Sequence, residues 1–571
     1  MNKSSDQPIQ FFRNIALTFS GGGYRASTFA LGVLSYLNHV QFKEKPLLEN
    51  VKGLSTVSGG TLTGATYACY RAKGEGFQSF FTHFYETLEK DQLLGTALKK
   101  LDNDQLWKNS HKKRSLINAF ALAYDELLTQ ETFRCLHENP SHLEDICFNA
   151  TDFSFGLAFR FQNSGKFGNY RLQNSNLSLL SQEMKISDAI ASSSCFPLGF
   201  EPLVMPDDFV SDHNSEAYIA IKVQKEFKNG VGIMDGGIVD NQGIGSIMNA
   251  DARRSRKGEA FDLIMVCDVG SYFMEPWVSS QIDMSRKGWG KSPRQLFNLL
   301  VKKLRSSWWM WLPILLSAVL LVLGLQFQAG TGFLIGGGAV GMLGLLAIAL
   351  KIGIARLEDS VLDKWDWIKG MVPGFIRDKL VRFENLKLRL IRRMLEERGT
   401  SAVKMISEIF LKQIRRLNYQ LFYTDEHLKH RRISTLIYEL TKEQYKHSES
   451  DEKEEEEKLE QIQEPGDRIY ASAKIASEMG TTLWFTQEDK DVHRLKNLVS
   501  CGQYTACYNL LKYCIDLKKD RAPVDDPQLL DEMIEVFQKD WTEFIDNPYF
   551  LHDGLLEVAK VEEVNDALVE V

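Results

Sequence analysis

The sequence lacks the cysteine patterns that mark a zinc site. Its eight cysteines form no Cys-x-x-Cys pair and no cluster with histidine at the spacing of zinc ligands. No EF-hand calcium loop is present either. We therefore expect reduced, mostly buried thiols in a cytoplasmic environment.

The chain also lacks an excess of positive charge. A formal net charge of −7 argues against general nucleic-acid binding, so we expect no nucleic-acid partner. The first eight residues are polar, and the apolar run after them has only the length of a strand, so we expect no secretory signal. With 571 residues, 44% of them apolar, the chain can hold a large α/β domain and at least one further unit.

A glycine triplet follows an apolar strand near the start of the chain. Gly21, Gly22 and Gly23 have no side chains, so their backbone N–H groups can approach a bound ester closely. A helix predicted from Arg25 to Leu37 directs its positive end at the same place. No Gly-Lys-Ser/Thr follows, which excludes a Walker-type phosphate loop, and Ala26 weakens a dinucleotide interpretation.

Two further turns carry candidate catalytic side chains. Ser58, in Ser55-Thr-Val-Ser-Gly-Gly60, is predicted at a strand-to-helix elbow with its hydroxyl exposed above the sheet edge. Asp235 ends a short apolar strand and opens a Gly-Gly turn. An Asp-Gly pair is also an ordinary turn signal, so the order of the three elements carries the argument.

That order, together with the intervening segment Ile186 to Phe200, resembles the patatin-like phospholipases and their cytosolic phospholipase A2 relatives. The resemblance covers roughly the first half of the chain. It implies a three-layer α/β hydrolase domain that cleaves lipid acyl esters through an acyl-enzyme, using a Ser/Asp dyad without histidine.

The resemblance also implies the roles of particular residues. Ser58 and Asp235 match the dyad, and Gly21, Gly22 and Gly23 match the oxyanion loop. Arg25 matches a basic residue expected to hold that loop and to favour anionic head groups, and Gly59 is expected at the substrate. Such a dyad requires neither a metal nor a cofactor. The triple serine at 192–194 is expected in a loop near the acyl channel.

One position departs from the family pattern. Thr56 stands where the family usually has a glycine two residues before the nucleophile, and a β-branched residue there puts the elbow geometry in doubt. The bottom-up chemistry still favours a dyad, because a partly desolvated aspartate has a raised pKa and can accept the serine proton.

The middle of the chain carries two long apolar runs. Residues 308–327 are uncharged, contain three tryptophans at one end, and are long enough to cross a bilayer, and residues 333–350 form a second uncharged run. Basic residues flank both sides, which predicts a membrane hairpin with the catalytic domain in the cytoplasm. A buried hairpin of a soluble core is the alternative.

The remaining segments complete the expected organisation. Residues 375–423 are predicted to be helical with a basic face, Arg415 included, suited either to an anionic lipid surface or to solvent in a helical bundle. The expected order is a catalytic domain over 1–280, a basic juxtamembrane segment over 281–306, the hairpin over 307–351, an amphipathic helical region over 352–446, an acidic disordered linker over 447–466, a helical region packing on the catalytic domain over 467–545, and a tail over 546–571.

Three functional hypotheses follow. The first is a membrane-anchored hydrolase of phospholipids, the second an inactive lipid-binding scaffold, and the third a signal-gated enzyme that degrades the cell's own membrane. The sequence does not choose an acyl position, a head group, an acyl acceptor or an oligomeric state.

Overall fold

A computed structural model describes residues 9–108, 110–171, 179, 181–271, 276–281, 290–292, 294–296, 298–299, 302, 312–326, 340, 342, 386–451 and 462–569. The chain divides into two compact units, one of residues 1–274 and 406–571 and one of residues 275–405. The first unit contains every predicted site residue. Its N-terminal part ends at residue 274, near the predicted boundary at 280, and residues 406–571 form its second part.

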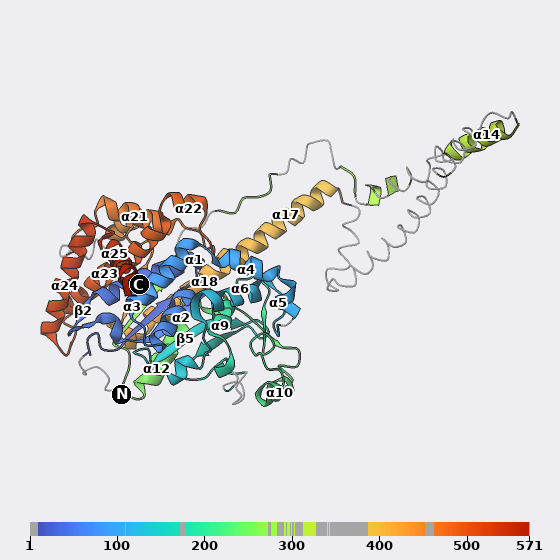
Figure 1. The fold of residues 1–571 in the computed structure, drawn as a ribbon. Helices are drawn as coiled ribbons and strands as arrows, with labels where there is room; N and C mark the ends of the chain where they lie inside the picture. The colour runs from blue at the N-terminus through green and yellow to red at the C-terminus, as the bar shows by residue number, and fades with distance from the viewer. Residues whose placement is uncertain are drawn as a thin grey trace. The chain divides into compact units, whose positions relative to one another are not determined.

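The first unit is built on one mixed sheet of eight strands (Figure 1). The strands are β1 (Ile15–Phe19), β4 (Val51–Val57), β5 (Asp145–Asp152), β6 (Leu157–Gln162), β7 (Leu203–Met205), β8 (Val231–Asp235), β9 (Leu263–Asp268) and β10 (Arg432–Leu436). Their order is β10-β9-β1-β4-β5-β8-β7, with β6 also paired to β5. The strands from β10 to β5 are parallel, whereas β6 and β8 run antiparallel to β5 and β7 runs antiparallel to β8.

Helices cover both faces of this sheet, which makes it a three-layer α/β arrangement. Strand β1 is buried throughout, and its residues alternate between two apolar clusters. Leu17 belongs to the larger cluster, together with apolar residues of α1 (Gly23–His39). Ala16 belongs to the smaller cluster, together with residues of α12 (Ile244–Ser255) and Phe422 of α18 (Leu411–Thr424). The eight cysteine side chains are buried and free.

The other helices of the first unit lie around these layers. They are α2 (Gly59–Ala72), α3 (Phe77–Lys90), α4 (Leu93–Leu101), α5 (Asp104–Lys108), α6 (Leu116–Tyr124), α7 (Cys135–Glu138), α9 (Ile186–Ser193), α10 (Glu216–Lys222), α11 (Gly237–Asp240), α19 (Lys442–Asp451), α21 (Asp467–Ser477), α22 (Gln487–Asp491), α23 (Arg494–Lys519), α24 (Pro527–Asp546) and α25 (Phe550–Val569). A short hairpin joins β2 (Gln41–Phe42) to β3 (Lys45–Pro46).

The region expected to be helical over 352–446 is only partly so. Residues 351–385 lie outside the described residues, and residues 388–424 are helical. Residues 432–436, however, form β10, which pairs in parallel with β9. The prediction of a separate helical region was wrong here, because the isoleucine and threonine of a short β segment find an open sheet edge far away in sequence.

Arg415 does not lie on a lipid-facing or solvent-facing surface of α18. Its Nε donates to the carboxylate of Asp268 at 2.6 Å, and its side chain is 13% exposed. Asp268, at the end of β9, is fully buried and also accepts hydrogen bonds from Tyr419 and Gln242. The basic pattern at this position therefore serves an ion pair between α18 and the sheet.

The C-terminal helices pack against the first helix of the chain. In Figure 1, α23 (red) lies beside α1 (blue), and the two cross through a pair of glycines. A Cβ on Gly32 would lie 2.1 Å from the carbonyl oxygen of Val499, and one on Gly502 would lie 2.2 Å from that of Phe29. Backbone approaches backbone at this crossing, so α1 and α23 form one rigid pair.

The expected acidic disordered linker over 447–466 is partly ordered. Residues 447–451 belong to α19, residues 452–461 lie outside the described residues, and the carbonyl of Gln463 accepts a hydrogen bond from Trp541 at 2.8 Å. The linker prediction was wrong at these positions, because the polar sequence conceals the few residues that pack. The segment expected as a tail, 546–571, contains α25, whose Leu551 and His552 are buried.

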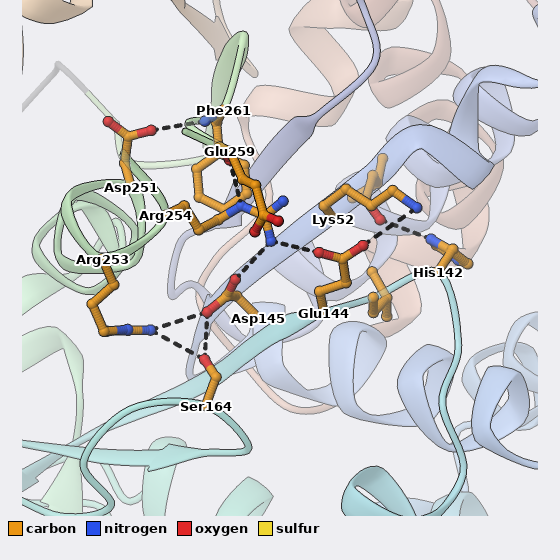
Figure 2. A network of polar contacts seen from close by, with 12 residues as sticks. Lys52, His142, Glu144, Asp145, Ser164, Asp251, Arg253, Arg254, Glu259 and Phe261 are labelled. Atoms are coloured by element: carbon orange, nitrogen blue, oxygen red, sulfur yellow. Dashed lines mark hydrogen bonds and ion pairs between the residues drawn. The ribbon is translucent and has the colours of Figure 1, made fainter. Parts of the chain in front are cut away.

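Figure 2 shows how the start of β5 is fixed to α12. Arg253 donates to the carboxylate of Asp145 at 3.1 Å, and Arg254 pairs with Glu144 at 2.6 Å and with Asp145 at 3.1 Å. Arg254 also donates to the carbonyl of Glu259 at 2.9 Å. These contacts lie at the end of β5 opposite to that reached by Ser58, so they anchor the strand without entering the candidate site.

Part of the two apolar runs belongs to the described residues. Helix α14 (Leu312–Gln326) has 15 residues within the first predicted span. The second run, 333–350, lies outside the described residues except at 340 and 342. No helix within the described ranges is both long and apolar enough to cross a membrane, so the predicted hairpin over 307–351 is unsupported. Helix α17 (Leu388–Lys404) also belongs to this second unit.

The glycine crossing gives a first prediction. Gly502→Ala should lower the free energy of unfolding by about 1–3 kcal/mol, because the new methyl would meet the Phe29 carbonyl at a backbone that has little room to shift. Gly95→Ala in α4 is the matched control, since a Cβ there meets nothing within 4 Å, and it should stabilise by up to about 1 kcal/mol. Thermal midpoints of both variants test this, and equal midpoints would contradict the crossing.

Candidate active site

Ser58 lies at a strained turn between β4 and α2. Its backbone has φ 50° and ψ −121°, a conformation that a residue with a side chain rarely adopts. The two glycines after it allow the turn to close. A Cβ on Gly59 would lie 2.0 Å from the carbonyl oxygen of Gly23, and one on Gly60 would lie 2.7 Å from the Cβ of Phe19. Gly59 was expected at the substrate, but the structure places its Cα against the glycine turn.

Thr56 fits the elbow for two reasons that the sequence did not reveal. Gly64 of α2 faces it, so that a Cβ on Gly64 would lie only 2.5 Å from the Thr56 methyl. The Thr56 hydroxyl also donates to the hydroxyl of Thr61 at 3.0 Å. A glycine on α2 thus makes the room that a glycine on the strand provides in the family pattern.

Asp235 reaches Ser58 because β4 and β8 meet along β5. Val57, the last residue of β4, pairs with Asn149, and Asp235, the last residue of β8, pairs with Ala150. A Cβ on Gly236 would lie 3.1 Å from a methyl of Val57, so both strand ends lie on the same side of β5. Because β4 runs parallel to β5 and β8 runs antiparallel to it, the two strands end next to each other.

The carboxylate of Asp235 is buried, 4% exposed, and the N–H of Gly237 donates to its Oδ1 at 2.6 Å. Burial raises the pKa of Asp235 to about 7, although the Gly237 N–H and the nearby Ser58 side chain both act to lower it. A base with a pKa in this range can accept a proton near neutral pH and later return it.

The glycine turn presents two donors rather than three. The N–H of Gly21 is taken by the carbonyl of Asn241 at 3.0 Å. Gly22 and Gly23 adopt φ 153° and φ 59°, and their N–H groups donate to no other described residue. A Cβ on Gly21 would lie 3.1 Å from that of Ser58, so these two donors lie close to the serine. Gly21 is expected to shape the turn, not to contact an oxyanion.

A C-terminal segment, residues 479–486, closes the outer side of this turn. The N–H of Tyr24 donates to the carbonyl of Thr482 at 2.8 Å, and a Cβ on Gly23 would lie 2.3 Å from the same oxygen. The ring of Phe485 packs on that of Tyr24 with centroids 5.2 Å apart. Nothing in the local sequence around residue 480 indicates this role, because the contact spans most of the chain.

Arg25 takes part in the same contact and does not face a head group. Its guanidinium is buried and donates to the carbonyl of Met479 at 2.7 Å. Burial lowers the pKa of Arg25 to about 10, while the nearby carboxylate of Asp268 acts in the opposite direction. The structure therefore places Arg25 as a link between α1 and the C-terminal segment. The expectation that it favours anionic head groups has no support in this placement.

Asn149 and Asn241 had no predicted role at the site, and Ser193 had a different one. Asn241 accepts from Gly21, and its side-chain oxygen would lie 2.4 Å from a Cβ on Gly21 and 2.6 Å from one on Gly237. Asn149 and Ser193 lie under the elbow and hydrogen-bond to it. The Ser192–Ser194 run was expected in a loop at an acyl channel, but Ser192 and Ser193 lie in α9 and Ser194 is its C-cap. The run of three serines was the signal in the sequence that could have indicated a residue beside the elbow.

Comparison with known families gives one match. The family model of patatin-like phospholipases matches residues 17–247. This part of the chain is therefore similar to a patatin-like phospholipase domain. A search of curated proteins found no match. The family implies hydrolysis of lipid acyl esters, and the matched segment contains the serine elbow, the glycine turn and Asp235. Strands β9 and β10 and the C-terminal helices of the first unit lie outside the match.

The burial of Asp235 has a measurable effect on stability. Its pKa is raised from 3.8 to about 7 in the folded protein, so the folded state holds a proton that the unfolded state releases between these values. Stability contributed by this group is therefore lost as pH rises through that interval, with about 4 kcal/mol as the upper bound. Asp235→Asn cannot titrate and should raise the thermal midpoint relative to the unmodified protein at pH 8, but little at pH 4.

The matched control is Asp104→Asn, which removes a carboxylate that is 80% exposed and pairs with Arg114 at 2.6 Å. The midpoint of this variant at each pH gives the effect of losing a surface carboxylate alone. A pH-independent effect of Asp235→Asn would show that the buried carboxylate does not titrate in this range.

Proposed function

We propose that the chain is a lipid acyl hydrolase that cleaves carboxylic esters of phospholipids with Ser58 as the nucleophile and Asp235 as the base. The observation that carries the proposal is that the strained turn at Ser58 and the buried carboxylate of Asp235, whose pKa is raised to about 7, meet at adjacent positions of β5. Serine needs such a base, because its hydroxyl is a weak nucleophile at neutral pH. The patatin-like domain supports the substrate class.

The reaction proceeds in two halves. Ser58 Oγ attacks the ester carbonyl as its proton passes to Asp235, and the N–H groups of Gly22 and Gly23 stabilise the negative oxygen. When the ester bond breaks, Asp235 returns the proton to the leaving alcohol. Water then attacks the acyl-enzyme and gives a proton to Asp235. As the ester bond breaks and the fatty acid leaves, Asp235 returns that proton to Ser58 Oγ, which restores the free enzyme.

Two features of the elbow favour an enzyme over an inactive scaffold. Thr56 was the reason to doubt the elbow, and Gly64 together with Thr61 accommodates it. Strain at Ser58 would have no use in a scaffold, whereas an enzyme uses it to expose the nucleophile. A signal-gated enzyme remains a form of the same proposal, differing only in control.

Labelling with a fluorophosphonate tests the nucleophile. The unmodified protein should be labelled and Ser58→Ala should not, while Asp235→Asn should lower turnover of a soluble ester by about a hundredfold to ten-thousandfold. The value of kcat/KM should rise with pH up to about 7, because only the ionised Asp235 accepts the proton. Equal turnover in Asp235→Asn would assign the base to another residue.

We further propose that residues 307–351 attach the enzyme to a membrane that contains anionic lipid, with the catalytic domain on the cytoplasmic side. Helix α14 has no charged residue, and several of its leucine and valine side chains are exposed, Leu315 at 64% and Leu325 at 72%. Exposed apolar side chains on an uncharged helix favour lipid as its surroundings. An attached enzyme would meet its substrate at a high local concentration.

Membrane fractionation tests the attachment. The protein should stay with membranes in high salt and in alkaline carbonate and should be released only by detergent, because buried apolar helices are held far more strongly than charge contacts. Deletion of residues 308–350 should yield a soluble protein that still cleaves small esters, since no proposed catalytic residue lies there. Release of the full chain by salt alone would contradict the attachment.

A further inference from the structure

The nucleophile elbow depends on a side chain from a distant helix. The backbone N–H of Ser58 donates to Oγ of Ser193 at 2.8 Å. Ser193 is the last residue of α9 and is fully buried. At a turn with φ 50°, the N–H of Ser58 has no partner in a strand or a helix. The Ser193 hydroxyl is the hydrogen-bond acceptor for this buried N–H.

The Ser193 hydroxyl uses all of its hydrogen-bonding capacity. It donates its one hydrogen to the carbonyl oxygen of Asn149 at 2.6 Å. Its two lone pairs are then left for the Ser58 N–H and for the hydroxyl of Thr61, which lies 2.8 Å away. Since a carbonyl can only accept, the direction of the chain is fixed: Thr56 donates to Thr61, Thr61 to Ser193, and Ser193 to Asn149.

The same end of α9 also holds the turn of the base. The N–H of Asp235 donates to the carbonyl of Cys195 at 3.0 Å, and the N–H of Gly236 donates to the carbonyl of Ser193 at 3.4 Å. A Cβ on Gly236 would lie 2.4 Å from the Asn149 oxygen that Ser193 contacts. One short stretch of chain, residues 193–195, therefore touches both the elbow and the aspartate turn.

We propose that Ser193 is a positioning residue that fixes the Ser58 hydroxyl relative to the Asp235 carboxylate. The proposal rests on the proposed function. Without the Ser193 hydroxyl, the Ser58 N–H loses its acceptor, and the elbow is free to turn its side chain away from Asp235. The cost falls on proton transfer and attack rather than on lipid binding, because Ser193 is buried beneath the elbow and is out of reach of a substrate.

The serine run supplies a matched control. Ser192 is fully buried in the same helix, but its hydroxyl donates to the carbonyl of Asp188 within α9 at 2.7 Å. Ser192→Ala therefore removes an equally buried hydroxyl without touching the elbow. Any effect of burial or of helix packing alone should be shared by Ser192→Ala and Ser193→Ala.

The experiment compares the two variants and the unmodified protein on a soluble ester. Ser193→Ala should lower kcat by about tenfold to a hundredfold with KM within twofold, and it should slow fluorophosphonate labelling by a similar factor. The lower pKa of its pH–rate profile should move upward, because a weaker bond from Ser58 no longer favours the charged carboxylate. Ser192→Ala should retain the kcat and the pH profile of the unmodified protein.

Each result separates the claims. Equal kcat in the two variants, or a fall confined to KM, would overturn the positioning role while leaving the hydrolase intact. An unmodified protein that is neither labelled nor active would overturn the proposed function, and the positioning role would fall with it. If Ser193→Ala does not give folded protein, Ser193→Cys carries the same test, since a thiol is only a weak acceptor for the Ser58 N–H; a kcat unchanged in that variant would overturn the proposal.

Discussion

Strand β5 pairs with β4 along its first part and with β8 along its last residues, and the catalytic end of the fold depends on this sharing. The two neighbours approach from opposite directions and stop at adjacent positions, Asn149 and Ala150. Neither strand can lengthen without displacing the other, so both must turn sharply out of the sheet. Ser58 and Asp235 are the residues at these two turns, and their proximity follows from strand pairing rather than from attraction between them.

Where β4 and β8 turn out of the sheet, backbone N–H and carbonyl groups lose their partners in the strands. Small polar side chains form hydrogen bonds with these groups instead. Ser55, Asn149 and Ser193 are buried and hydrogen-bonded to one another or to the backbone at the junction. An apolar core could not replace this network, because each unpaired N–H or carbonyl would cost about 1–3 kcal/mol. The candidate site is thus polar beneath Ser58.

The sequence predicted the parts of this site that depend on close neighbours in the chain. Glycines after a strand, a serine before two glycines and an Asp-Gly pair all have local conformational meaning, and the structure brings the three turns together. The roles of Arg25 and Arg415 could not be predicted in this way. Each is a basic residue on a helix, and only the distant carbonyl of Met479 or carboxylate of Asp268 makes it a buried link. Strand β10 was missed for the same reason, since its partner β9 lies far back in the sequence.

Residues 23–25 and residues 479–482 form a contact whose hydrogen bonds join positions 454 (Arg25 to Met479) and 458 (Tyr24 to Thr482) apart in the sequence. Because a ribosome makes the chain from its N-terminus, the serine elbow and the glycine turn emerge long before the carbonyls that close over them. A nascent chain therefore carries Ser58 beside an unfinished turn. Translation order thereby delays completion of the candidate site until nearly the whole first unit has been made.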